Sequence, residues 1–199
     1  MKRCLVGSEM CIRDSSDNDG ICYRTYPGTH PEKGAYFTRG TSHDEYARYT
    51  EDGNINAQTL TRLMRKFRTA TDLVPEPIIE INGEDSCGVI YYGSSKPAVL
   101  EAKDILKTKN INLDLMQIRS FPFNLDVWEF IANHDRIYVV EQNRDSQMRT
   151  LIMAEGGISA EILRPLVHFT GDPIEASYIV NKISEREVNY KSHKNIKER

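Results

Sequence analysis

The regular alternation of short apolar runs with helical segments in residues 84–184 is the feature that most limits how this chain can fold. The expected strands are Gly88–Gly93, Leu113–Ile118, Ile137–Glu141 and Glu161–Phe169. Each return to a neighbouring parallel strand needs a crossover, and a helix is the usual one. The sequence therefore predicts an α/β domain in which helices flank a mainly parallel sheet.

The segments after these strands carry apolar residues at helical spacing. The expected helices are Ala98–Lys107, Leu125–Ala132, Gln147–Met153 and Ile174–Ile183. Residues 185–199 are charged and polar without an apolar period, which predicts a solvated polar tail with no catalytic role.

The first fifteen residues are of a different kind. Leu5–Asp14 resembles the translation of a transposase-type sequencing adapter, a contaminant of reading frames taken from metagenomic assemblies. Charges throughout Lys2–Ser15 leave no room for the apolar core of a signal peptide. We expect residues 1–15 to be an artefact, the genuine protein to begin near Ser16, and its upstream part to be missing.

Residues 17–52 are polar and aromatic, which is typical of a long irregular segment that packs on another part of a protein. Ile55–Ala70 predicts an amphipathic helix. Its apolar stripe is Leu60, Leu63, Met64 and Phe67, and the basic residues expected to face away are Arg62, Arg65, Lys66 and Arg68. Two prolines then mark residues 71–83 as a linker with a short strand at Ile78–Ile81.

Composition argues against several classes of partner. A formal net charge of −3 with interspersed signs gives no basic face for nucleic acid and no polybasic stripe for a membrane surface. No apolar run approaches the roughly 20 residues that cross a bilayer. The four cysteines form no CxxC pair for zinc or an iron–sulfur cluster, and this usage favours a reducing, cytoplasmic location.

Two loops of the predicted sheet are candidate sites, because parallel sheets bind ligands beyond the carboxyl ends of their strands. Gly93–Lys96 leads into a helix N-terminus and could hold an anion, but helix capping by serine explains these residues better. Glu141, Asn143 and Arg144 are candidates for a subunit interface. Contact with a ligand, or a polar turn bonded to its own backbone, is the alternative for these three residues.

The irregular segment holds a second set of candidates. Arg39, His43 and Asp44 could orient an anionic substrate, because the guanidinium fork suits a carboxylate. A metal site of His30, His43, Asp44 and Glu45 is disfavoured, since no pair matches an HxxxH or HExxH array. We therefore expect no metal site.

Three stretches, Gly20–Pro31, Gly34–Asp52 and Val139–Met148, closely resemble the alpha subunit of 2-oxoacid (2-oxoglutarate):ferredoxin oxidoreductases. The family has a pyrimidine-binding domain followed by a transketolase C-terminal-like α/β domain. The resemblance implies that residues 16–70 are the end of the former and residues 84–184 the latter.

The resemblance also implies an activity: oxidative decarboxylation of a 2-oxoacid to an acyl-CoA, with electrons passing to ferredoxin. Thiamine diphosphate, Mg and an iron–sulfur cluster are expected mainly on the partner beta subunit, with none bound by this fragment alone. The family's substrate and cofactor contacts lie upstream, so no catalytic residue carries over. The fragment is expected to be scaffold and subunit interface; the alternative is a stand-alone, non-catalytic α/β ligand-binding or interaction module.

Overall fold

The structure, a computed structural model, describes residues 2–3, 19–21, 23–24, 44, 49–83 and 86–197. The chain divides into two compact units, Met1–Val74 and Pro75–Arg199. In the first unit, β1 (Lys2–Arg3) and β2 (Tyr23–Arg24) pair antiparallel.

Helix α1 (Gly53–Thr71) is the longest described element of the first unit. Asp52 caps its start, because its carboxylate accepts a hydrogen bond from the Asn54 amide at 2.8 Å. The expectation that the basic residues of this helix all face away is wrong for Arg62. The Arg62 side chain is buried and donates to the Gly20 carbonyl at 3.1 Å.

Arg62 is buried because Gly20 lies close against this face of α1. Gly20 has a φ of 72°, and a Cβ on it would lie 2.6 Å from the backbone nitrogen of Lys66, so only glycine fits. Nearby, the Thr69 hydroxyl donates to the Asp19 carbonyl at 2.6 Å. The segment around Gly20 therefore packs against backbone and polar groups of the helix, whereas Met64 of the apolar stripe is 62% exposed.

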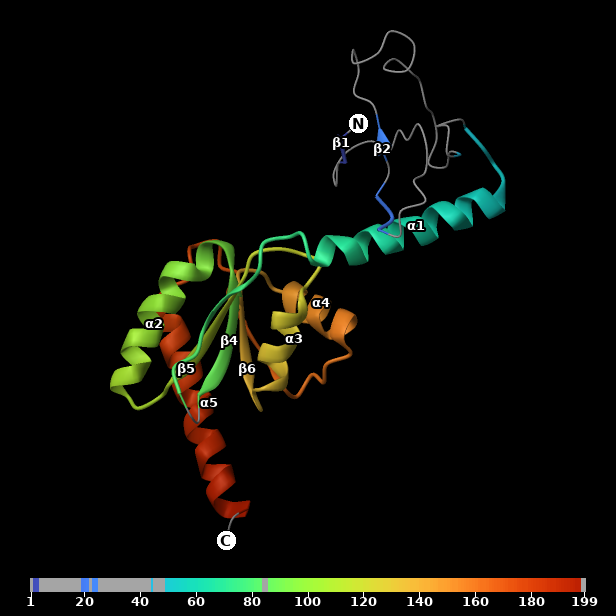
Figure 1. Cartoon of the computed structure of the whole chain (residues 1–199). Coiled ribbons are helices and arrows are strands. Elements are labelled where there is room, and N and C mark those ends of the chain that lie inside the picture. Colours follow the sequence, from blue (N-terminus) through green and yellow to red (C-terminus); the bar gives the residue numbers. More distant parts are fainter. Residues whose placement is uncertain are drawn as a thin grey trace. The chain divides into compact units, whose positions relative to one another are not determined.

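A five-stranded sheet in the order β3-β5-β4-β6-β7 forms the centre of the second unit (Figure 1). Its strands are β3 (Ile78–Glu80), β4 (Cys87–Tyr92), β5 (Leu113–Ile118), β6 (Ile137–Glu141) and β7 (Leu163–Val167). Strands β4 to β7 are parallel, and β3 runs antiparallel to β5. The predicted mainly parallel sheet is confirmed.

Prolines lie before one edge strand of the sheet and within the other. The sequence assigned Ile78–Ile81 to the linker, but β3 pairs with β5 and is one edge of the sheet. Pro75 and Pro77 precede it, and a residue without an N–H is tolerated beside an edge strand. Pro165 lies within β7, the other edge, where the missing N–H interrupts no central ladder.

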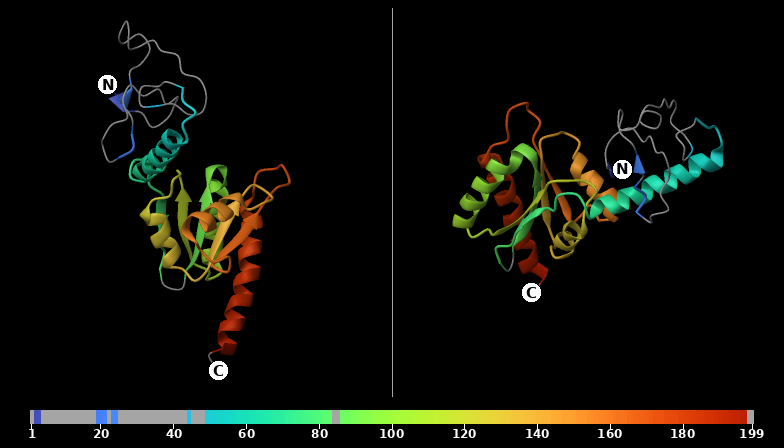
Figure 2. Two further views of the ribbon diagram at one scale, coloured as in Figure 1. Left: turned by 90° about the vertical axis from the view of Figure 1, so that its right-hand side faces the viewer. Right: turned by 45° about the horizontal axis from the view of Figure 1, so that its top comes forward.

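Helices cover both faces of this sheet (Figure 2). The strands β4 to β7 are followed in turn by α2 (Lys96–Thr108), α3 (Leu125–Ala132), α4 (Gln147–Gly156) and α5 (Ala176–Lys197). One buried cluster joins α2 and α5 to the sheet, and a second joins α3 and α4 to its other face. Because the central strands are buried on both faces, they read in the sequence as continuous apolar runs.

Helix α5 corrects the expectation of a polar tail. The helix continues through residues 185–197 instead of ending at Ile183, and Glu187 is only 1% exposed. The Glu187 carboxylate accepts hydrogen bonds from Arg136 Nε at 3.0 Å and from the Tyr138 hydroxyl at 2.9 Å. An ion pair rather than an apolar stripe holds this turn of the helix to the sheet, so hydrophobic periodicity could not reveal it.

Candidate functional site

The loops after β4 and β6 meet at the carboxyl ends of the strands, where the chain order of the sheet reverses. Strand β5 lies on one side of β4 and β6 on the other, which is the topological switch point where open α/β sheets bind ligands. Gln142 Nε2 donates to the hydroxyls of Ser94 at 2.9 Å and Ser95 at 3.3 Å, and Gln142 Oε1 accepts from the Ile174 amide at 3.3 Å. One side chain thus ties three loops together.

The serines of the first loop do not act as expected. Ser95 occupies the N-cap position of α2, but its hydroxyl makes no capping hydrogen bond. Its backbone is helical (φ −71°, ψ −14°) because a 3-10 turn, Gly93–Ser95, runs directly into α2. A capping side chain needs an extended backbone at this position, so the hydroxyls are turned to Gln142 instead.

Glu141, the last residue of β6, is the true cap in this site. Its carboxylate accepts hydrogen bonds from the amides of Met148 at 2.8 Å and Arg149 at 2.9 Å, in the first turn of α4. Ser146, at the N-cap position of α4, has a φ of 52° and makes no capping bond of its own. A negative charge at a helix N-terminus is favourable, and Glu141 is 0% exposed, so the carboxylate is fully committed inside the chain.

Asn143 and Tyr92 complete the hydrogen bonding of Glu141. Asn143 Nδ2 donates to Glu141 Oε2 at 2.8 Å, while its Oδ1 accepts from the amides of Asp145 at 3.1 Å and Gln147 at 3.3 Å. The Tyr92 hydroxyl donates to Glu141 Oε2 at 3.5 Å, and burial together with the Glu141 carboxylate raises the pKa of Tyr92. The sequence analysis did not single out Tyr92. The signal that could have found it is its position, because Tyr92 ends β4 as Glu141 ends the neighbouring strand β6.

Arg144 differs from its neighbours because its side chain is 74% exposed. It pairs with Asp145 at 2.7 Å, and an exposed pair of this kind adds little stability. Glu141 and Asn143 make hydrogen bonds within their own turn and to the start of α4, as the alternative of a polar turn bonded to its own backbone predicts. Arg144 is the one of the three interface candidates whose charged group is accessible, and its contact with another subunit stays a prediction.

Of the candidates of the first unit, only Asp44 lies in the described part of the chain. Arg39 and His43 lie outside the described residues, and Asp44 is half-buried. Within the described ranges, no group of three histidine, cysteine or acidic side chains is placed to hold a metal ion. Their role at a substrate route stays a prediction.

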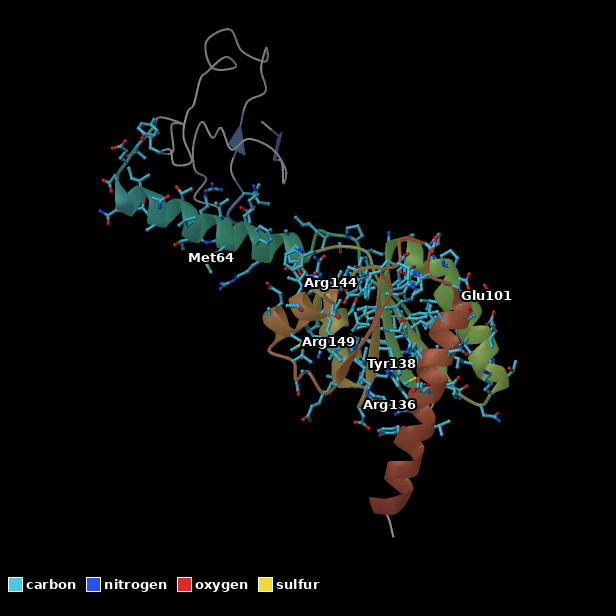
Figure 3. The ribbon with its side chains drawn as sticks, turned by 180° about the vertical axis from the view of Figure 1, so that it is seen from behind. Met64, Glu101, Arg136, Tyr138, Arg144 and Arg149 are labelled. Carbon is cyan, nitrogen blue, oxygen red and sulfur yellow. The ribbon has the colours of Figure 1, made fainter. Side chains whose placement is uncertain are left out.

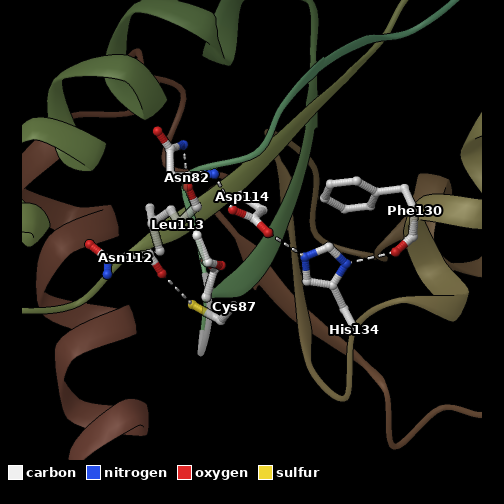
Figure 4. A network of polar contacts seen from close by, with 9 residues as sticks. Asn82, Cys87, Asn112, Leu113, Asp114, Phe130 and His134 are labelled. Carbon is white, nitrogen blue, oxygen red and sulfur yellow. Dashed lines mark hydrogen bonds and ion pairs between the residues drawn. The ribbon is translucent and has the colours of Figure 1, made fainter.

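A second buried polar cluster lies at the amino ends of the strands and was missed by sequence reasoning (Figure 4). His134 is held between the Phe130 carbonyl, 2.7 Å from Nδ1, and the Asp114 carboxylate, 3.1 Å from Nε2. The other Asp114 oxygen accepts from the Asn82 amide at 2.7 Å. These bonds fasten the β3–β4 connection and the end of α3 to β5, which is a structural task.

The cysteines supply no nucleophile in the described part of the chain. Cys87 is fully buried in β4, and burial, together with the nearby Glu187 carboxylate, raises the pKa of its thiol to about 12. Such a thiol stays protonated at neutral pH and behaves as a small apolar residue. The other three cysteines lie outside the described residues.

Comparisons with known proteins give this fold a family context. No protein-family model matches the chain. The alpha subunit of 2-oxoacid:ferredoxin oxidoreductase 2 from Aeropyrum pernix is 28% identical over 155 residues, covering 73% of this chain and 24% of that protein. The alpha subunit of 2-oxoacid:ferredoxin oxidoreductase 1 from Sulfurisphaera tokodaii is 29% identical over 160 residues, covering 78% of this chain and again 24% of the relative.

A solved structure shares the fold. The 2-oxoglutarate:ferredoxin oxidoreductase of Magnetococcus marinus, solved with 2-oxoglutarate, coenzyme A and succinyl-CoA bound, superimposes with a TM-score of 0.74 at 22% identity, over 90% of this chain and 31% of that one. The chain spans about a quarter of the length of its curated relatives. These relatives confirm the resemblance that the three sequence stretches indicated.

Among the described helices, none combines the length and apolarity needed to cross a membrane.

Proposed function

We propose that this chain is part of the alpha subunit of a thiamine-diphosphate-dependent 2-oxoacid:ferredoxin oxidoreductase, in which it acts as scaffold and subunit interface. The observation that carries the proposal is the similarity to two alpha subunits over about three quarters of the chain. The reaction of the whole complex would convert 2-oxoglutarate and CoA to succinyl-CoA and CO2 while reducing ferredoxin. The beta subunit, ferredoxin and CoA are the partners that this role requires.

The chemistry of the described side chains favours a scaffold over a catalytic centre. The polar groups at the switch point are largely bonded to one another, with Gln142 joining the loops and Glu141 capping α4. No metal-binding group of three is present among the described residues, and Cys87 is held as a protonated thiol. A buried, protonated thiol does not suit an iron–sulfur cluster, and we assign this cluster and thiamine diphosphate with Mg mainly to the beta subunit.

Two sets of residues would link this chain to the active complex. Arg144 would contact the beta subunit from the turn that Glu141 and Asn143 hold in place. Arg39, His43 and Asp44 would line the route of the 2-oxoacid, because a guanidinium group beside polar side chains can pair with the substrate carboxylate. In this proposal Arg144 affects assembly of the complex, and Arg39, His43 and Asp44 affect turnover.

Co-purification tests the assembly part. The chain, joined to the upstream part of a related alpha subunit, is co-expressed with the matching beta subunit, and complex formation is measured by size-exclusion chromatography. Arg144→Glu should weaken association, whereas Lys109→Glu, a charge reversal in the exposed turn after α2, should not. Failure of the unaltered chain to associate would favour the stand-alone interaction module.

Steady-state kinetics test the catalytic part in the same complex. CoA-dependent reduction of ferredoxin by 2-oxoglutarate is followed, with the chain alone expected to be inactive. Arg39→Ala and His43→Ala should raise KM or lower kcat while the complex stays assembled. Kinetics unchanged by both variants would reject the substrate route, and activity of the chain without a beta subunit would reject the scaffold role.

A further inference from the structure

A cluster of cationic and aromatic side chains lies at the amino ends of β6 and β7, at the opposite end of the sheet from the switch point. It combines three arginines, one just before β6, one in β7 and one in α5, with two tyrosines and one carboxylate: Arg136, Arg164, Arg186, Tyr138, Tyr190 and Glu187. Figure 3 shows Arg136 and Tyr138 beside α5. Neither the proposed function nor the switch-point site uses these residues.

Glu187 is fully engaged by Arg136. Arg136 Nε lies 3.0 Å from both Glu187 oxygens, and a second guanidinium nitrogen lies 3.0 Å from Oε2. Burial opposes the charge of Arg136, but the carboxylate outweighs it and the pKa of Arg136 is raised. The Tyr138 hydroxyl also donates to Glu187 at 2.9 Å. This pair is therefore neutral as a unit and has no charge left for its neighbours.

Arg164 and Arg186 have no acidic partner in the described part of the chain. Arg164 donates to the Tyr138 hydroxyl at 3.4 Å, and Arg186 donates to the Pro165 carbonyl at 2.8 Å. Both acceptors are neutral oxygens. Each guanidinium carbon lies 5.8 Å from the centroid of the Tyr138 ring, and that of Arg164 lies 5.5 Å from the centroid of Tyr190. Two positive charges are thus held in half-buried positions around the same ring.

This arrangement calls for an anion. Like charges that are partly removed from water are unfavourable unless a counter-charge offsets them. A guanidinium group has five N–H donors in a planar fork, far more than the single acceptor that each arginine uses among the described residues. Aromatic rings hold the forks in place, so little side-chain entropy is lost when a planar or tetrahedral oxyanion binds.

We propose that Arg164 and Arg186 form an oxyanion-binding site that takes a phosphate or carboxylate group. The tyrosine rings position the two forks, and the neutral Arg136–Glu187 pair fastens α5, which carries Arg186, to the sheet. The site does not depend on the proposed oxidoreductase role, and its test uses the 199-residue chain alone. A carboxylate or phosphate group of a small molecule fits this chemistry.

Inorganic phosphate at about pH 8 is the first probe, since it is then mainly a dianion. The melting temperature is measured against phosphate concentration, with sodium chloride and sodium acetate at matched ionic strength as further arms. Phosphate should give saturable stabilisation beyond the sodium chloride arm. Arg164→Gln and Arg186→Gln should each weaken phosphate binding about tenfold, which corresponds to roughly 1.4 kcal/mol. Arg144→Gln, at the distant exposed turn, should leave phosphate binding unchanged.

The result that overturns the site is phosphate acting no better than sodium chloride, or acting equally on the two glutamine variants. Saturable protection by acetate but not by phosphate assigns the site to carboxylates; protection by both assigns it to oxyanions in general. If a glutamine variant does not fold, Arg164→Lys replaces it, because it keeps the charge and loses the fork. Unchanged phosphate affinity in Arg164→Lys also rejects recognition by the guanidinium fork.

Discussion

Replacing Glu141 by alanine is the sharpest test of the architecture at the switch point. The Glu141 carboxylate is fully buried and accepts hydrogen bonds from the amides of Met148 and Arg149 and from Asn143 Nδ2, all within 2.9 Å. Alanine would leave these donors facing a cavity without an acceptor. It would also remove the negative charge from the N-terminus of α4.

The magnitude follows from these contacts. A buried donor left unsatisfied costs about 1–3 kcal/mol, and the loss of a helix cap typically costs about 1 kcal/mol. Partial relaxation of the turn offsets some of this, so we expect Glu141→Ala to lower the free energy of unfolding by roughly 3–5 kcal/mol. For a unit of this size the melting temperature should fall by roughly 12–20 °C.

Urea unfolding followed by circular dichroism measures this loss. The matched control is Glu155→Ala, which removes the same charge from an exposed position in α4 and should change stability by less than about 0.5 kcal/mol. Glu141→Gln should fall between the two, because the amide keeps one acceptor oxygen but turns an NH2 group toward a backbone donor. A Glu141→Ala protein within 1 kcal/mol of the parent, on the scale of an ordinary exposed substitution, would refute the assignment of Glu141 as the cap.

Three further predictions concern other buried or paired groups. Glu187→Ala should destabilise the second unit by about 3–5 kcal/mol in urea unfolding, because it removes the carboxylate that neutralises the buried Arg136 charge. The hydrogen bond from Lys103, at 2.7 Å, lowers the pKa of Glu80 from 4.5, so this pair's contribution is present above pH 4.5 and is lost as the pH falls through the lowered value. Because the Glu80 side chain is 44% exposed, that contribution should stay below about 1 kcal/mol in pH-dependent unfolding. Iodoacetamide at about pH 8 should leave Cys87 unlabelled in the native protein and label it in urea, as read by peptide mass spectrometry.

Each of these predictions has a clear contrary outcome. Glu185→Ala removes an exposed charge from α5 two residues before Glu187, and equal destabilisation by Glu185→Ala and Glu187→Ala would count against the buried pair. Glu80→Gln should reduce the loss of unfolding free energy at acid pH. If that loss is unchanged, a group other than Glu80 is responsible for it. Rapid native labelling of Cys87 would show that β4 is exposed by local opening.

The elements of the second unit could largely be predicted from the sequence. The strands Leu113–Ile118 and Ile137–Glu141 and the helix Leu125–Ala132 have the expected bounds, because a strand buried on both faces must be apolar throughout and a helix between sheet and solvent must repeat near 3.6 residues. The same patterns indicated the mainly parallel sheet and located the polar turn after β6.

What each polar residue does was decided only by the tertiary structure. Glu141 was a candidate for an interface or for an internal polar turn, and the structure shows it capping α4. Ser95 looked like a cap and is bound by Gln142, and Glu187 looked like part of a solvated tail and is buried against Arg136. Hydrophobic periodicity reports the average environment of a face and is local in sequence. A hydrogen bond or ion pair depends on which atoms meet after distant segments have packed, as between Arg136 and Glu187, so only the folded chain fixes it.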